Sequence, residues 1–444
     1  VIEEKEYKNA FRRIIKQKPE EVKLESLRKL KREFHFRICL QIFLNLINSN
    51  QAGIAFTNLS GACLEIVLEI TILNVTKRYG DPPCNFGLVM FGRFASTQMN
   101  ASSDLDFVIV YDNEKKKNSV SPSYYFASFA RTLISFLSSP MSEGKLYETD
   151  MRLRPSGLTG PVATSLKSFK DYYKFRAWEW EKIAIKKTKV ISLEKKYYIK
   201  LNKALQYVKK VKIEVKQLAS EIIKMKQTRK LNDLKSSKYE TKYVDGGQRD
   251  LEFLISFIDF SNKNIQDKES FAMTQKLYDS IDQIISSCFE KPIKENFSNS
   301  FINSLLKFTG ISDVKELDKK LKNSKILISK KLNYYLKIYS KKTIWKCFRI
   351  MDKLTNIKVF SETAKFKSLA RAAEKLNLSA SSVSKHISAL ENHLGVRLMN
   401  RTTRKVSITD IGAAYLEKAN KIIQDIEDAE NMINASQKSP RGLL

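Results

Sequence analysis

The spacing of apolar positions changes several times along the chain, and each change predicts a different element. Residues 24–47 and 62–79 carry apolar side chains three and four positions apart, which predicts two helices. Short apolar runs at 86–91 and 107–111 are typical of consecutive strands, and the turn that starts at Gly80 ends the helix before them. The beginning of the chain therefore predicts helices packed on a small sheet.

The middle of the chain predicts mostly helices. A helix is expected at 124–137, a strand at 146–151 and one long basic helix at 200–229. Residues 254–345 have helical spacing but no chemical signature, and they predict a helical bundle. The aromatic side chains near a helix face before this bundle are expected to be core rather than ligand-stacking residues: Phe175, Trp178 and Trp180.

From Met351 onward the pattern changes to short helices joined by a tight turn, which is typical of a helix-turn-helix. Ser368 and Ser379 are expected to be N-caps, because each precedes an apolar-periodic segment. The elements expected in this part are helices, a basic strand-rich wing and a long helix, at residues 351–364, 368–376, 380–394, 397–409 and 410–435.

Composition limits the class of protein. With 444 residues, 43% hydrophobic and 29% charged, the chain is expected to be a soluble globular protein of two to four domains. The net charge of +31 is spread along the chain, so we interpret much of it as compositional bias that could also steer an acidic partner. Five scattered cysteines and three histidines argue against disulfide frameworks and zinc sites. A charged start and the lack of a long uncharged apolar run predict no signal peptide and no membrane span, hence a cytoplasmic protein.

Two aspartates lie two positions apart where the second strand begins. Side chains alternate across a strand, so Asp104 and Asp106 face the same side and raise each other's pKa. A divalent cation would remove this repulsion, and oxygen ligands suit Mg²⁺ together with the phosphates of a nucleotide. Asp150, on the strand expected at 146–151, could complete a site of three carboxylates. From these residues alone, a pair of exposed strand aspartates stays open as the alternative.

Two further segments offer groups that bind anions. Arg152 and Arg154 flank a leucine on an expected strand, so they share a face and could bind phosphate oxygens, with salt bridges to nearby aspartates as the alternative. Gly246 and Gly247 precede a helix, where backbone N–H groups can face an anion.

Four motifs occur in one order: GRFASTQMNASSDLD from Gly92, YETDMRLRPSGLTGP from Tyr147, WEWEKIAIKKTKV from Trp178 and KYVDGGQRDLEF from Lys242. In this order and spacing, residues 1–345 resemble the glutamine synthetase adenylyltransferase (glutamate–ammonia-ligase adenylyltransferase) family. The resemblance is to its C-terminal, adenylylating half. It implies Mg²⁺-dependent transfer of AMP from ATP to a tyrosine of glutamine synthetase.

The resemblance also implies roles for individual residues. Asp104, Asp106 and Asp150 would bind two Mg²⁺ ions and carry catalysis. The nucleotide would be contacted or supported by residues of three motifs: Ser96, Ser103, Arg152, Arg154, Gly246 and Gly247. The chain has Ala95 where the family usually has Gly, and Gln98 where it usually has Glu. A methyl group in that turn could crowd the nucleotide, so reduced rather than abolished activity is expected.

The second short helix near the C-terminus is expected to expose side chains that can enter a major groove: Ser381, Ser382, Ser384, Lys385 and His386. Arg401 and Arg404, in the wing, would neutralise phosphates. The sequence from Met351 resembles the N-terminal DNA-binding domain of LysR-type transcriptional regulators, with His386 where that family often has Gln. The resemblance implies binding of double-stranded DNA, in which Ser368 and Ser379 would also take part, a homodimer through the last helix, and a missing effector domain.

The predicted fold class is α+β: a nucleotidyltransferase-type mixed sheet with flanking helices, a helical bundle, and a C-terminal winged helix-turn-helix with a long dimerisation helix. The expected divisions are a helical lead-in, a catalytic domain, a bundle, a DNA-binding domain and a dimerisation helix, at 1–80, 81–195, 196–345, 351–410 and 411–444. Three interpretations stay open: an adenylyltransferase with an incidental appendage, a DNA-binding regulator with a vestigial or artefactually joined enzyme fragment, and a true fusion of both activities.

Overall fold

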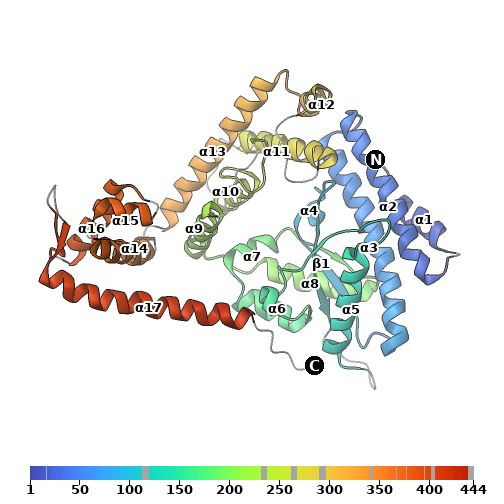
Figure 1. Ribbon diagram of the computed structural model, residues 1–444. Helices are drawn as coiled ribbons and strands as arrows, with labels where there is room; N and C mark the ends of the chain where they lie inside the picture. The colour runs from blue at the N-terminus through green and yellow to red at the C-terminus, as the bar shows by residue number, and fades with distance from the viewer. Residues whose placement is uncertain are drawn as a thin grey trace. The chain divides into compact units, whose positions relative to one another are not determined.

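The computed structural model forms two compact units, Val1–Tyr339 and Ser340–Leu444 (Figure 1). The residues that it describes are 1–16, 18–112, 120–231, 238–261, 268–289, 297–340, 344–366, 368–376, 378–394, 396–401 and 406–438. Each unit has its own apolar core. The first unit holds the expected small sheet and most of the helices, and the second holds the expected helix-turn-helix elements.

The sheet of the first unit is mixed. Its strands are β1 (Phe86–Met90), β2 (Leu105–Tyr111), β3 (Thr149–Asp150), β4 (Ala163–Ser165) and β5 (Lys189–Ile191), in the order β3-β2-β1-β5, with β4 also paired to β2. Strand β1 pairs antiparallel with β2 and with β5, whereas β3 and β4 run parallel to β2. The prediction of an α+β protein with a mixed sheet is confirmed, although the third strand is shorter than the six residues expected.

Helices cover both faces of the central strands, which explains why these strands are continuous apolar runs. Leu88 and Ile109 belong to a core shared with α3 (Ser49–Tyr79) and α5 (Pro122–Ser138). Their neighbours Val89 and Val108 belong to a second core, shared with α6 (Leu166–Phe175) and α8 (Lys195–Lys209). Because side chains alternate across a strand, burial on both faces requires apolar residues at successive positions.

The longest helix against the sheet is α3, which packs beside α1 (Glu4–Ile15), α2 (Glu20–Phe43) and α5 (Figure 1). Asn48 caps it, accepting a hydrogen bond from the Gln51 backbone N–H at 3.0 Å. Among the described residues it is the one helix long and apolar enough to cross a membrane, but 67% of its most apolar window is buried within the protein. We therefore interpret α3 as the central core helix of this unit.

The prediction of one long basic helix at 200–229 is wrong. The structure has two helices here, α8 and α9 (Val215–Leu231), separated by residues 210–214. The break is stabilised from outside the segment, because the Glu214 backbone N–H donates to Glu179 Oε2 at 2.9 Å. The helical bundle consists of α9 with four further helices: α10 (Gln248–Ser261), α11 (Lys268–Cys288), α12 (Asn299–Thr309) and α13 (Val314–Ser340).

In the residues that the structure describes, the second unit has four helices and a two-stranded sheet. Helix α14 (Ile344–Phe366) precedes the pair α15 (Leu369–Lys375) and α16 (Ala380–Leu394). Strands β6 (Met399–Arg401) and β7 (Val406–Ile408) pair antiparallel, and α17 (Asp410–Lys438) follows. Val383, Ile387 and Leu390 of α16 are buried at the spacing of one helix face. The position of α16 agrees with the expected range, and Ser379 caps it by accepting from the Ser382 N–H at 3.2 Å.

Candidate functional site

Two of the three predicted carboxylates lie side by side. Asp106 on β2 is the direct register partner of Asp150 on β3, and the Leu105 N–H donates to the Glu148 carbonyl at 2.9 Å. Burial, followed by the nearby charge of Asp150, raises the pKa of Asp106 to about 6, and Asp104 adds to the effect. Lys242 and Arg249 oppose it. The raised pKa therefore reflects mainly the burial of this carboxyl group, with the neighbouring carboxylates adding to it.

Asp150 is paired with the arginine two positions later. The Arg152 Nε and Nη2 atoms donate to Asp150 Oδ2 at 2.8 and 2.5 Å, and the Arg152 backbone N–H donates to Oδ1 at 2.8 Å. Burial alone would raise the pKa of Asp150, but these hydrogen bonds outweigh it and lower that pKa. The Arg152 side chain is 73% exposed and that of Asp150 is 17% exposed, so the guanidinium lies at the surface while the carboxylate is mostly buried.

The predicted aspartates have the chemistry of ligands for a divalent cation, but their arrangement fits such an ion less well. Asp106 and Asp150 supply adjacent carboxylate oxygens, which are the ligands that Mg²⁺ prefers. Within the described residues, however, no three His, Cys, Asp or Glu side chains are grouped so that they could hold a metal ion. The guanidinium of Arg152 is hydrogen-bonded to the Asp150 carboxylate. Asp104 is exposed and lies directly before the start of β2.

The turn between β1 and β2 contains the short helix α4 (Gly92–Ala95). Gly92 has a φ of +57°, and a Cβ atom there would collide with Asp106 Oδ2, so glycine is required beside the carboxylate. Ser96 is exposed, and its hydroxyl donates to the Gly92 carbonyl at 3.2 Å. Ser103 donates to Asn100 Oδ1 at 2.6 Å. Ala95, the departure from the family pattern, is buried at 8% exposure.

The expectation that Arg152 and Arg154 share one face of a strand is wrong. Residues 152–154 form a turn after β3, and the two side chains separate: Arg152 is exposed and Arg154 is 8% exposed. Arg154 donates to the carbonyls of Gly160 at 3.1 Å and Met151 at 3.2 Å. Arg154 therefore stabilises the turn, and Arg152 is the arginine placed at the carboxylates.

Gly246 and Gly247 lie buried within the bundle, and their backbone N–H groups are already engaged. The Gly246 N–H donates to Asp250 Oδ2 at 2.9 Å, and the Gly247 N–H donates to the Val244 carbonyl at 3.0 Å. Asp250 is fully buried and is also paired with Lys226 at 2.5 Å. In this geometry the Gly-Gly turn supports α10, and its predicted contact with a nucleotide stays a prediction.

The tryptophan-containing motif differs from its predicted core role. Phe175 is 71% and Trp178 is 54% exposed, and Trp180 is partly buried, whereas Glu179 and Glu181 are buried. Glu181 accepts from the Tyr172 hydroxyl at 2.8 Å and from the Trp178 backbone N–H at 2.9 Å. The two glutamates thus join α7 (Glu179–Ala184) to its neighbours. The apolar periodicity of the sequence does not predict the burial of Glu179 and Glu181, because both side chains are acidic.

Sequence reasoning missed three residues that hold the β1–β2 turn: Arg93, Gln248 and Asp282. Arg93 forms an ion pair with Asp282 of α11 and donates to Gln248 Oε1 at 3.0 Å. The three lie far apart in the sequence, and none of their spacings suggests a contact. Gln248 directly follows the Gly-Gly turn, and this adjacency is the one available signal.

The helix-turn-helix places some of its predicted DNA-contacting residues at the surface. Ser368 and Ser379 each accept a hydrogen bond from the first turn of the helix that follows, and Ser382 and Ser384 are partly exposed. His386 Nδ1 lies 2.6 Å from Asn356 Oδ1 of α14, so this ring is attached to the neighbouring helix. For the other residues that were predicted to contact DNA, either the side chain or the whole residue lies outside the described part of the chain: Ser381, Lys385, Arg401 and Arg404.

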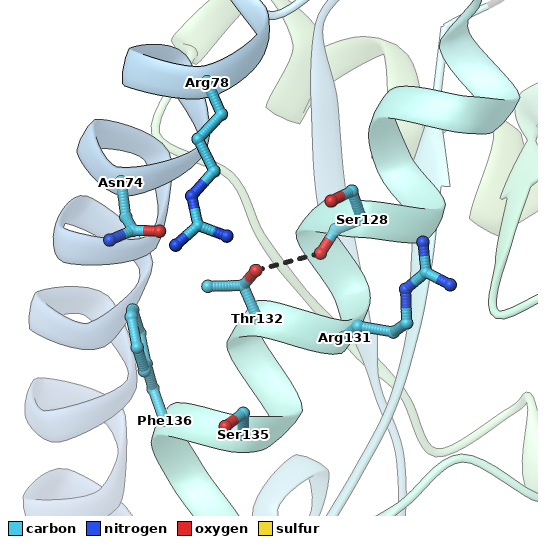
Figure 2. A pocket seen from close by; sticks show the side chains of 7 residues that line it. All are labelled: Asn74, Arg78, Ser128, Arg131, Thr132, Ser135 and Phe136. Carbon is cyan, nitrogen blue, oxygen red and sulfur yellow. Dashed lines mark hydrogen bonds between the residues drawn. The ribbon is translucent and has the colours of Figure 1, made fainter.

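A polar groove lies between α3 and α5, away from the predicted carboxylates. Figure 2 shows Asn74 and Arg78 on one side of it and Ser128, Thr132 and Phe136 on the other. The Thr132 hydroxyl donates to the Ser128 carbonyl at 3.1 Å, within α5 itself. None of the residues predicted to bind the nucleotide or the metal lines this groove.

The first unit thus holds a mixed sheet with paired aspartates, and the second holds a helix-turn-helix. Residues 2–204 match the family model of glutamate-ammonia ligase adenylyltransferase. Residues 354–413 match the model of bacterial regulatory helix-turn-helix proteins of the LysR family. Both resemblances inferred from the motifs are thereby confirmed for these segments.

Curated relatives are similar to the first segment. Two of them are described as bifunctional glutamine synthetase adenylyltransferase/adenylyl-removing enzymes, from Brucella suis biovar 1 (strain 1330) and Mesorhizobium japonicum (strain LMG 29417 / CECT 9101 / MAFF 303099). They are 31% and 32% identical to this chain over 241 and 245 residues, which cover 53% and 52% of it. The chain spans 24% of the length of each relative.

Solved structures are similar to a shorter part of the chain. One, described as a BenM_DBD/catB site 1 DNA complex, is 26% identical and covers 19% of this chain and 96% of its own, with a TM-score of 0.19. A second, described as an H2O2-bound mutant of Corynebacterium glutamicum OxyR, is 34% identical and covers 20% of this chain and 28% of its own, also with a TM-score of 0.19.

Proposed function

We propose that the first unit transfers AMP from ATP to a tyrosine of glutamine synthetase. The observation that carries this proposal is the register pairing of Asp106 with Asp150 beside a glycine turn, within a segment similar to adenylyltransferases. The tyrosine oxygen would form a bond to the α-phosphorus, and the bond from that phosphorus to the β-phosphate bridging oxygen would break. Pyrophosphate leaves, and the tyrosine proton passes to solvent.

The residues of the chain have distinct tasks in this proposal. Asp104, Asp106 and Asp150 would hold Mg²⁺, which would supply positive charge at the reacting phosphate. Arg152 moves from Asp150 to the phosphates, which its exposed position permits. Ser96 and Ser103 lie in the turn that faces the nucleotide.

The test is transfer of label from ATP labelled at the α-phosphate to glutamine synthetase in the presence of Mg²⁺. Labelling of a tyrosine is expected with the unchanged chain, and Asp106→Asn should lower the rate by at least about 100-fold, because it removes a carboxylate at the reacting phosphate. Arg12→Gln, at an exposed ion pair with Glu69 between α1 and α3, serves as a comparison outside the site. Unlabelled glutamine synthetase with the unchanged, folded chain would contradict the proposal.

Ala95 should reduce the transfer rate rather than abolish it. Ala95→Gly is therefore expected to increase the rate several-fold if the methyl group restricts the turn. The methyl group is buried, so an unchanged rate would mean that it packs inside the protein without affecting the nucleotide.

A second function is favoured by the C-terminal match. We propose that residues 354–413 bind double-stranded DNA through α16 and the β6–β7 hairpin, with α17 as a dimerisation helix, in a cytoplasmic protein. Retention of DNA fragments at low salt that falls steeply as salt rises is expected. Detection of one polypeptide of about the calculated 51.2 kDa in cells, rather than two products, would distinguish a true fusion from joined coding regions.

A further inference from the structure

One carboxylate of the helical bundle contacts two residues of the turn between β1 and β2. Asp282 Oδ2, on α11, accepts hydrogen bonds from Arg93 Nη1 and from Asn100 Nδ2, the latter at 2.5 Å. Arg93 lies at the start of the turn and Asn100 near its end. A single side chain from a distant helix therefore holds both ends of the segment that contains Ser96.

Neighbouring contacts reinforce this attachment. The second terminal nitrogen of Arg93 donates to Gln248 Oε1 at 3.0 Å, and Gln248 belongs to the motif that contains the Gly-Gly turn. Gln283, next to Asp282, donates to the Met99 carbonyl at 2.7 Å. The bundle thus contacts the turn through α10 and α11, at side chains and at the backbone.

The attachment continues to the predicted catalytic residues. The Asn100 N–H donates to Ser103 Oγ at 2.9 Å, and the Ser103 hydroxyl donates back to Asn100 Oδ1 at 2.6 Å. Asp104 follows directly, and β2 with Asp106 begins one residue later. Asn100 is 5% exposed, and the side chains of Arg93 and Asp282 are 21% and 19% exposed. Hydrogen bonds of charged groups that are partly buried are stronger than those of ion pairs at the protein surface.

We propose that Asp282 is a positioning residue for nucleotidyl transfer: from α11 it fixes the turn 92–104 in the conformation that presents Ser96 and Asp104 to the nucleotide. The inference rests on the proposed AMP transfer and gives the helical bundle a task in it. Asp282 does not touch the reacting atoms. Its removal should leave the fold intact and misplace the turn, and a displacement of about 1 Å at a reacting centre can cost about 100-fold in rate.

The test compares Asp282→Asn with the unchanged chain in two measurements. Hydrogen exchange of peptides covering residues 92–104 should become faster in the variant, whereas exchange in α13 should not. In the transfer assay, kcat/KM for ATP should fall by about 10- to 100-fold. Asp282→Glu, which keeps the charge, should recover part of the loss.

Asp318→Asn is the matched control, because Asp318 pairs with Lys238 at 3.1 Å within the bundle and does not contact the turn. Arg93→Gln should have an effect similar to that of Asp282→Asn, and the double variant should be little worse than either, as expected for two residues that act through one contact.

The outcomes separate the two proposals. If the unchanged chain transfers no AMP, the proposed function fails, whatever the exchange data show. If it transfers AMP and Asp282→Asn leaves both the exchange of residues 92–104 and kcat/KM unchanged, the positioning role is overturned. A loss in Asp282→Asn that is matched by Asp318→Asn would also overturn it, because the effect would then be one of general stability.

Discussion

His35 on α2 places an ionisable ring directly against the segment that leads into β2. Its Nε2 lies 3.0 Å from the Ala101 carbonyl, which accepts the ring proton, and Nδ1 lies 3.7 Å from Cys39 Sγ. Burial, and next the positive charge of Lys31 on the same helix, lower the pKa of His35 to about 4. The ring is therefore neutral in the folded protein at pH values where it is already protonated in the unfolded chain.

This difference predicts a loss of stability in mild acid. Because the folded pKa is depressed, the stabilisation is present above the unfolded pKa of about 6.5 and is lost as the pH falls from there toward 4. Between pH 7 and pH 5 the group should lower the free energy of unfolding of the first unit by about 2 kcal/mol. Urea denaturation of the unchanged chain and of His35→Gln at both pH values measures it. If the free energy of unfolding falls by the same amount in the two proteins, His35 is not the group that causes the loss.

The sequence predicts the place and role of some site residues but not of others. Asp106 and Asp150 are predictable because Asp106 directly precedes one apolar run and Asp150 lies on another expected strand, so both are expected in the sheet. The roles of Arg152 and Arg154 are not predictable, since the chain turns after β3 and separates two side chains that a strand would align. Asp282 is invisible for another reason: its partners come from a different part of the chain, and its own helix shows no motif.

At the scale of elements, the sequence predicts where helices and strands lie but not how neighbours end them. The bounds of α16 and the C-terminal end of β2 follow from caps and apolar runs, because their determinants are local. The break between α8 and α9 is stabilised by Glu179, 35 residues before Glu214, so the apolar period alone predicts one helix. The Gly-Gly turn before α10 likewise depends on contacts with α13.

The glycine of that turn provides a prediction with an internal control. Gly246 has a φ of +73°, and a Cβ atom there would collide with the backbone of Lys325 in α13. Gly310, after α12, has a similar φ of +66° but open space around it. Gly310→Ala should cost only the conformational penalty of about 1 kcal/mol. Gly246→Ala should cost at least about 3 kcal/mol, because a backbone clash adds to that penalty. Chemical denaturation of both variants decides it, and equal costs would contradict the packing described.

At the scale of the whole molecule, the chain consists of two units with separate apolar cores. The sequence indicates this division, because the helix-turn-helix pattern begins where the bundle pattern ends. The two units divide between Tyr339 and Ser340, whereas the sequence predicts a division between residues 345 and 351. Separate cores mean that a change of charge in one unit removes no packing from the other, so the two proposed activities should respond to mutation independently.

Independence of the two units can be tested with one substitution in each. Asp104→Asn should abolish AMP transfer by removing a carboxylate beside Asp106, and the affinity for double-stranded DNA should stay unchanged. Arg397→Gln, at an exposed position before β6, should weaken DNA binding at low salt and reduce the slope of log affinity against log salt by about 1, with transfer unchanged. Filter retention over a salt series and the labelling assay measure both quantities on the same preparations. Loss of DNA retention in Asp104→Asn comparable to its loss of transfer would mean that the two units are energetically coupled.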